Sequence, residues 1–171
     1  QKMLQTGIPF TKKPVALQFD YKVKMSDREN RIRATGFSKI TDVPGKDYPA
    51  AILLLQKRWE DANGNVYAKR IGTMVTYYYH STDWKNNVTY EIMYGDITNR
   101  PEYKAHMMRL QATESYTVNS KGESVPIHEV AWGDENDVPT HMYIQFTSSH
   151  GGAYIGSPGN TLWVDNVKLV Y

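Results

Sequence analysis

The segment Pro14-Val15-Ala16-Leu17-Gln18-Phe19-Asp20-Tyr21-Lys22-Val23-Lys24 decides the fold class. From Val15 to Val23, every second residue is apolar or aromatic, and the residues between them are mostly polar. Successive side chains of a strand point to opposite faces, so this period of two predicts a half-buried β-strand. A chain of 171 residues is long enough to bury one sizeable core. We expect Leu17, Phe19 and Tyr21 at the centre of that core.

Comparable segments follow along the rest of the chain. The pair Asn63-Gly64 between two apolar runs is a strong hairpin signal. Residues 103–113 have good helix propensity but also alternate, and we interpret them as a strand because their surroundings are strands. No long amphipathic helix is predicted. The pattern indicates an all-β, antiparallel β-sandwich of jelly-roll type, forming one domain over residues 1–171. Further strands are predicted at residues 50–60, 66–70, 72–80, 88–94, 140–148 and 161–171.

The last two predicted strands contribute to the core in different ways. Ile144 and Phe146 alternate with polar neighbours, so both are expected to be buried. In residues 161–171, Leu162 and Val164 share one phase, whereas Val167, Leu169 and Tyr171 share the other. A regular strand cannot turn both sets towards one core. We therefore predict a β-bulge at Asp165-Asn166, with Trp163 pointing away from the main core.

Charge and composition exclude several classes of function. The net charge is only +2, and the lysines and arginines are scattered rather than gathered in the basic stripe of a nucleic-acid-binding protein. The absence of cysteine excludes thiol catalysis and thiolate metal sites. The longest apolar run, residues 50–55, is too short to span a membrane. The first four residues lack the apolar core of a signal peptide, which we interpret as a mature or internal end.

Several segments together resemble a known family. These are Gly7-Ile8-Pro9-Phe10 with residues 14–21, then residues 139–149 (PTHMYIQFTSS), and residues 158–169 (PGNTLWVDNVKL). They resemble the carbohydrate-metabolism domain, PCMD, of surface lipoproteins of gut bacteria. Residues 82–85 (TDWK) and 162–167 (LWVDNV) are also similar to jelly-roll carbohydrate-binding modules. The resemblance implies an exported, carbohydrate-associated domain at the extracellular or outer-membrane surface. The expected partners are a polysaccharide or other glycan and other domains of a longer surface lipoprotein.

The aromatic residues suggest where a glycan would bind. The chain has 13 Tyr and four Trp but only four Phe, so amphipathic rings outnumber purely apolar ones. Ordinary sheet packing accounts for most of them. Rings beside a few amide or carboxylate groups are typical of ligand pockets. The candidate ligand-binding residues are Trp132 with Asp134 and Asn136, Tyr143 with His141 and Gln145, Tyr154 in a glycine-rich loop, and Trp163.

One carboxylate is a candidate metal ligand. The resemblance to jelly-roll binding modules implies that Asp165, in the terminal strand, ligates a structural calcium ion. The alternative, which we favour, is that Asp165 accepts hydrogen bonds from backbone amides of the glycine-rich loop. Calcium takes six to eight oxygen ligands, and no second carboxylate partner is identifiable. No other cofactor is expected.

An enzyme remains a less favoured alternative. A glycosidase needs two facing carboxylates, and nothing in the sequence singles out a pair. The histidines have no metal-binding spacing, and no Gly-x-Ser-x-Gly motif is present. Non-catalytic glycan binding is therefore the preferred hypothesis, and an adhesion or assembly domain that binds protein partners is the main alternative. The candidate carboxylates are Glu60, Glu91, Glu129, Asp134 and Glu135.

Overall fold

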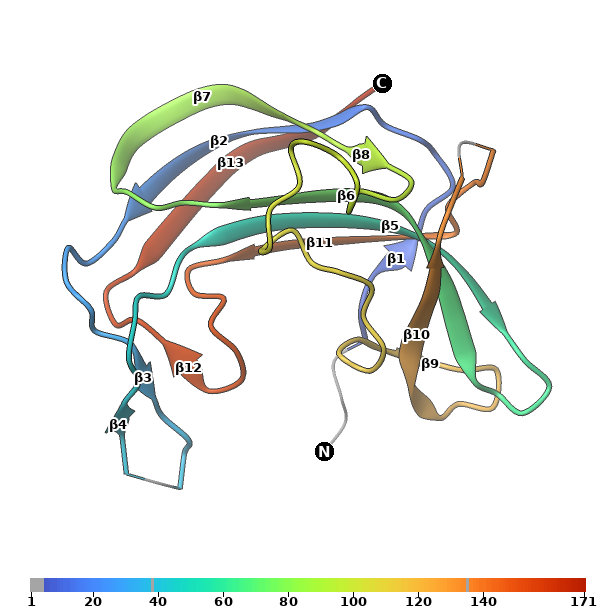
Figure 1. Ribbon diagram of the computed structural model, residues 1–171, viewed down its shortest axis with the longest axis horizontal. Coiled ribbons are helices and arrows are strands. Elements are labelled where there is room, and N and C mark those ends of the chain that lie inside the picture. Colours follow the sequence, from blue (N-terminus) through green and yellow to red (C-terminus); the bar gives the residue numbers. More distant parts are fainter. Residues whose placement is uncertain (1–4, 38, 135) are drawn as a thin grey trace.

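The structure is a computed structural model that describes residues 5–37, 39–134 and 136–171. It is built from strands arranged in three sheets (Figure 1). The long sheet has the order β1 (Ile8–Pro9), β11 (His141–Thr147), β5 (Ala50–Glu60), β6 (Val66–Tyr77), β10 (Ser124–Trp132) and β9 (Tyr116–Val118), with β8 (Met93–Tyr94) also on β6. The small sheet contains β13 (Thr161–Val170), β2 (Ala16–Lys24) and β7 (Thr82–Glu91). A third sheet joins β12 (Ile155–Gly156), β3 (Ile32–Arg33) and β4 (Thr41–Asp42).

The small sheet covers the convex face of the long sheet, which confirms the predicted β-sandwich (Figure 1). The chain passes from one sheet to the other between β2 and β5, between β6 and β7, and between β11 and β13, as in a jelly roll. One pairing departs from the antiparallel pattern, because β10 lies parallel to β6. The hairpin signal at Asn63-Gly64 joins β5 to β6, and Gly64 has the positive φ of 92° that such turns favour.

The predicted core lies between the two sheets. Leu17 and Phe19 are completely buried. The Phe19 ring meets Phe146 edge-on at 5.0 Å between centroids and stacks on Tyr90 at 5.2 Å. Tyr21, Ile144 and Phe146 pack against the same cluster but are only half-buried, so the expectation of complete burial is confirmed for Leu17 and Phe19 alone.

The predicted bulge in β13 is present. Pairing with β2 shifts register between Asp165 and Lys168, and Asn166 adopts a positive φ of 52°. Because of the bulge, Leu162, Val164 and Leu169 all pack against the core, whereas Trp163 is 40% exposed on the outer face. Of the second predicted set, only Leu169 reaches the core, since Val167 and Tyr171 are exposed.

The prediction of a strand at residues 103–113 is wrong. This segment forms turns and irregular structure, and Met108 has a positive φ of 56° that interrupts any strand. Its backbone carbonyls accept bonds from a side chain of the sheet instead, since Arg70 donates to the carbonyls of Met108 and Arg109. Met107 and Met108 pack on the face of the long sheet opposite the small sheet.

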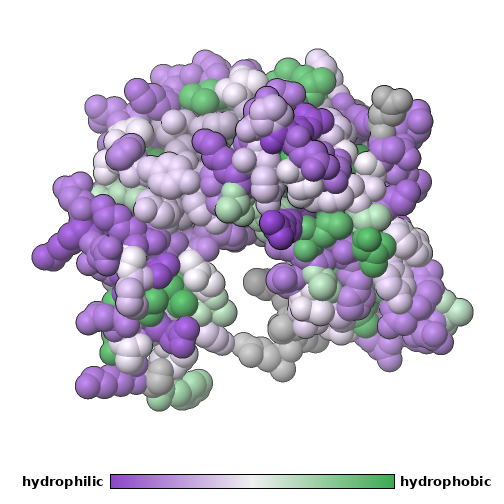
Figure 2. All heavy atoms as spheres, in the orientation of Figure 1, coloured by the Kyte–Doolittle hydropathy of each residue, from purple (hydrophilic) through white to green (hydrophobic). Residues whose placement is uncertain are grey.

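The long sheet curves, and its ends extend beyond the small sheet. β3, β4 and β12 form one flank, and β9, β10 and the outer half of the β5–β6 hairpin form the other (Figure 1). The space-filling view shows the molecule hollowed between these flanks (Figure 2). Among the described residues, no helix is long and apolar enough to cross a membrane.

Candidate functional site

The hollow side of the long sheet carries a mixed apolar and aromatic surface, here called the concave face. It is formed by alternate side chains of the three central strands. Ile52 lies opposite Gln145 on one side and Val75 on the other, and Leu54 lies opposite Tyr143. Because side chains alternate between faces, these residues point away from the main core. The concave face comprises Ile52, Leu54, Val75, Tyr77, Tyr143 and Gln145. Ile52, Leu54 and Val75 are buried beneath Met107 and Met108, so Tyr77, Tyr143 and Gln145 are the partly exposed members of this face.

A cluster of rings gathers around Tyr77 at the end of β6. His106 stacks on the Tyr77 ring at 4.6 Å, and His150 meets that ring edge-on at 5.7 Å. Tyr48 lies 6.4 Å from Tyr77 and 4.8 Å from Tyr79. The cluster combines residues from four separate parts of the chain, and none of its rings belongs to the main core.

The rings of this cluster are uncharged, although the Asp47 carboxylate lies beside His150 and accepts its backbone N–H at 3.0 Å. Burial lowers the pKa of His106, and the positive charge of Lys104 lowers it further. Burial also lowers the pKa of His150, although Asp47 opposes this shift. Both imidazoles are therefore uncharged at neutral pH. Burial raises the pKa of the Tyr77 and Tyr143 hydroxyls, so each remains a protonated donor.

A buried ion pair closes the other end of the concave face. Arg70 and Glu129 pair through both carboxylate oxygens, and neither side chain is more than 1% exposed. Gln56 donates to the same carboxylate at 2.6 Å, and the backbone N–H of Gln111 donates at 2.8 Å. Buried charges are costly unless they are paired and hydrogen-bonded, and this pair meets both conditions. It fixes the segment containing Met108 against the sheet.

Of the sequence candidates, Tyr143 and Gln145 lie on the concave face, and the Tyr143 hydroxyl donates to the Gln145 side chain. His141 is the first residue of β11, two residues before Tyr143, and its Nδ1 is 2.9 Å from Thr140 Oγ1. Burial, aided by the charge of Arg58, lowers the pKa of His141.

The candidates around Trp132 lie beside the buried ion pair and in the turn that follows β10. The guanidinium carbon of Arg70 lies 5.7 Å from the centre of the Trp132 ring, so the half-buried ring helps to cover the buried ion pair. Asp134 accepts bonds from the backbone N–H groups of Asn136 and Asp137, as in a side-chain-stabilised turn. Asp137 in turn pairs with two lysines. Glu135 lies outside the described residues.

The remaining candidates lie away from the concave face. Tyr154 is 63% exposed in the loop before β12, and Trp163 lies on the outer face of the small sheet beside Lys22. The exposed Asp165 side chain accepts from the backbone N–H of its neighbour Asn166, so the expectation that it bonds the glycine-rich loop is wrong. Asp47 instead accepts from the backbone N–H of His150 at the start of that loop. Within the described part of the chain, no three His, Asp or Glu side chains gather in a way that would hold a metal ion.

Asp20 organises the irregular positions of the two strands that flank β2. It is 9% exposed and accepts bonds from the side chain of Asn166 and the backbone N–H of Asn87. These bonds, with that of Asn166 the stronger, lower the pKa of Asp20. Both asparagines have positive φ at irregular positions of the two strands that flank β2. In the alternation of residues 14–24, Asp20 belongs to the polar set that is expected to face solvent. The sequence therefore did not predict a buried, hydrogen-bonded role for it.

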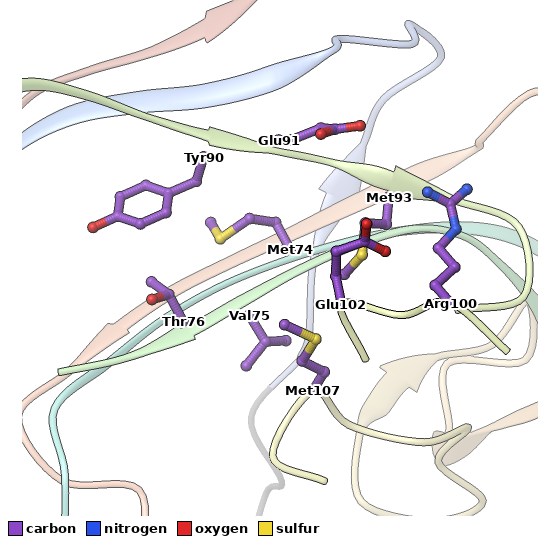
Figure 3. Close-up of a pocket in the computed structure, with 9 residues that line it drawn as sticks. All are labelled: Met74, Val75, Thr76, Tyr90, Glu91, Met93, Arg100, Glu102 and Met107. Carbon is purple, nitrogen blue, oxygen red and sulfur yellow. The ribbon is translucent and has the colours of Figure 1, made fainter. Parts of the chain in front are cut away.

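A separate cavity of about 300 Å³ opens beside β6 (Figure 3). Met74, Met93 and Met107 line it, and Glu102 and Arg100 lie near one end. Arg100 donates to the Tyr94 carbonyl at 2.7 Å, which holds the overlying loop on the strand. We interpret this cavity as the space left where the loop crosses the edge of the sheet.

The sequence missed most of the ring cluster. Tyr77 and Tyr79 alternate with the buried Tyr78, which was a usable signal for two rings on one face. His106, His150 and Tyr48 lie in turns or loops, where periodicity gives no information. Comparison with protein-family models, with curated proteins and with solved structures found no match for this chain, so the choice of site rests on its geometry.

Proposed function

We propose that the chain binds carbohydrate, without cleaving it, on the concave face. The observation that carries the proposal is the ring cluster around Tyr77, at one end of a sheet face whose partly exposed members also include Tyr143 and Gln145. Sugars present apolar C–H patches that stack on rings, and hydroxyls that bond with amides and phenols. A mostly apolar, aromatic surface with a few polar groups meets both needs.

The positions of the candidate carboxylates favour binding over hydrolysis. Glycosidases need two carboxyl groups about 5–9.5 Å apart across the scissile bond. Glu129 is buried and paired with Arg70, so it cannot face a substrate. Glu60 accepts bonds from the backbone and hydroxyl of Ser120 near the end of the hairpin, and Glu91 lies on β7 of the other sheet.

The proposed setting follows from the resemblance to surface-lipoprotein domains. We propose that the chain is exported and acts at the bacterial surface, beside other domains of a longer lipoprotein. Its ligand is then a polysaccharide or another glycan outside the cell.

The experiment is a glycan array on the purified chain, followed by calorimetric titration of any ligand found. Tyr77→Ala and Tyr143→Ala should each weaken binding at least tenfold, because a millimolar dissociation constant corresponds to only about −4 kcal/mol and one ring is a large part of it. Trp163→Ala is the matched control, since it removes a ring from the outer sheet. It should bind as the parent does.

Melting curves must show that the two tyrosine variants remain folded. If only Trp163→Ala loses binding, the concave face is the wrong site. If the parent binds no glycan on a broad array, the adhesion alternative takes precedence. Release of sugar from a polysaccharide would contradict the non-catalytic assignment.

A further inference from the structure

β11 has a free edge beyond its short pairing with β1. β1 covers only His141 and Met142. At Gly7 the chain turns away with a φ of +85°, and a Cβ there would lie 2.9 Å from the Met142 carbonyl oxygen. The preceding residue, Thr6, donates to Tyr116 instead. Among the described residues, no strand continues alongside β11 after Met142.

The free edge presents backbone hydrogen-bonding groups. The carbonyl of Thr140 accepts from Phe10 on the β1 side, and backbone groups alternate sides along a strand. The N–H and C=O groups of Ile144 and Phe146 therefore point outward. An open cavity of about 320 Å³ lies where this edge begins, between residues 5–8 and β11, and it is lined by Gln5, Gly7, Ile8, Met142, Tyr143 and Ile144.

This edge lacks the usual protection against pairing with another chain. Natural sheets protect edges with charges, proline, bulges or covering loops. The free part of β11, Tyr143-Ile144-Gln145-Phe146-Thr147, has no charge, no proline and no register shift. By contrast, β7 at the edge of the small sheet carries Asp83, Lys85 and Glu91. The open edge of β6 lies under the loop that contains Arg100 and Met107 (Figure 3).

We propose that β11 pairs antiparallel with β11 of a second copy of this chain, around a two-fold axis at Gln145. In this register Ile144 of each copy exchanges a reciprocal pair of backbone hydrogen bonds with Phe146 of the other. Gln145 lies opposite Gln145, and Tyr143 lies opposite Thr147, so no like charges meet. A two-fold interface must be self-complementary. This edge meets that condition, because each residue from 143 to 147 pairs with an uncharged residue of the same segment in the other copy. The concave faces of the two copies become one continuous surface.

Cysteine cross-linking tests the register directly, because the chain has no cysteine of its own. Opposed residues in a non-hydrogen-bonded pair have Cα atoms about 4.5 Å apart, within the range of about 4.4–6.8 Å for disulfides. Gln145→Cys should therefore form a covalent dimer under mild oxidation. Tyr143→Cys and Thr147→Cys should cross-link with each other when mixed and remain monomeric alone. Thr89→Cys, an exposed position on edge strand β7, is the control and should remain monomeric.

Light scattering coupled to gel filtration tests the association of the unmodified chain. The parent should approach twice its 19.6 kDa mass as its concentration rises. Gln145→Lys and Gln145→Glu should each be monomeric, and an equimolar mixture should regain the dimer mass because opposite charges then meet. A parent that stays monomeric at millimolar concentration, or cross-linking no greater at position 145 than at position 89, would overturn the proposal. Neither experiment uses a glycan, so its result is independent of the proposed function.

Discussion

At the residue scale, Phe19 joins the two sheets. Its completely buried ring contacts Phe146 of the long sheet and Tyr90 of the small sheet. Phe19→Ala should lower the free energy of unfolding by about 3–5 kcal/mol, because it removes buried apolar surface and leaves a cavity. Urea denaturation measures the loss. Phe37→Ala, at a fully exposed ring, is the control and should change stability by less than about 0.5 kcal/mol.

Also at the residue scale, Asp137 couples stability to pH. The pKa of Asp137 is lowered to about 2 by hydrogen bonds. The largest effect comes from Lys57, followed by the backbone N–H of Asp134 and the side chain of Lys69. An unfolded Asp has a pKa of about 3.9, so the folded carboxylate contributes stability above pH 4. That contribution is lost as the pH falls from about 4 to 2. Denaturation midpoints at several pH values should fall less steeply for Asp137→Asn than for the parent, and parallel curves would contradict this assignment.

At the element scale, the bulge of β13 depends on Asn166. Its φ of 52° suits glycine or asparagine, and its side chain donates to Asp20 at 2.7 Å. Asn166→Val should destabilise the chain by about 1–3 kcal/mol, because a β-branched residue is strained at positive φ. Asn166→Gly relieves that strain but loses the hydrogen bond, so thermal melting should place it between Asn166→Val and the parent. Equal losses would show that the hydrogen bond, rather than backbone strain, controls the bulge.

The elements differ in how far the sequence predicts them. The bulge was predictable because Leu162 and Leu169 cannot both face one core in a regular strand, which is a constraint within a single element. The conformation of residues 103–113 was not predictable, because it depends on bonds with Arg70 of β6 and Glu129 of β10, which are distant in the sequence. Local alternation does not distinguish a strand from a loop that packs on a sheet.

At the scale of the whole molecule, the sandwich was predictable and most of the site was not. The strands can be recognised in the sequence because apolar and polar residues alternate with a period of two and turn residues lie between them. The ring cluster instead forms where β6, two loops and the start of β5 converge, so only Tyr143 and Gln145, on a well-defined strand, were identified beforehand. The contact of Trp132 with the buried Arg70 was not predictable either, because Arg70 lies on another strand.

The pairing of β2 with β13 has a consequence for how the chain acquires its structure. Ala16 of β2 lies opposite Val170 of β13, and nearly the whole described chain separates the two residues. β2, the central strand of the small sheet, therefore gains one of its two neighbours only through a very distant pairing. Closing such a long loop costs entropy before any contact is gained, and folds dominated by distant pairings reach the native state slowly. During synthesis, one edge of β2 remains unpaired until residues Thr161–Val170 have been made. The last strand therefore acts as a late, committing step of folding.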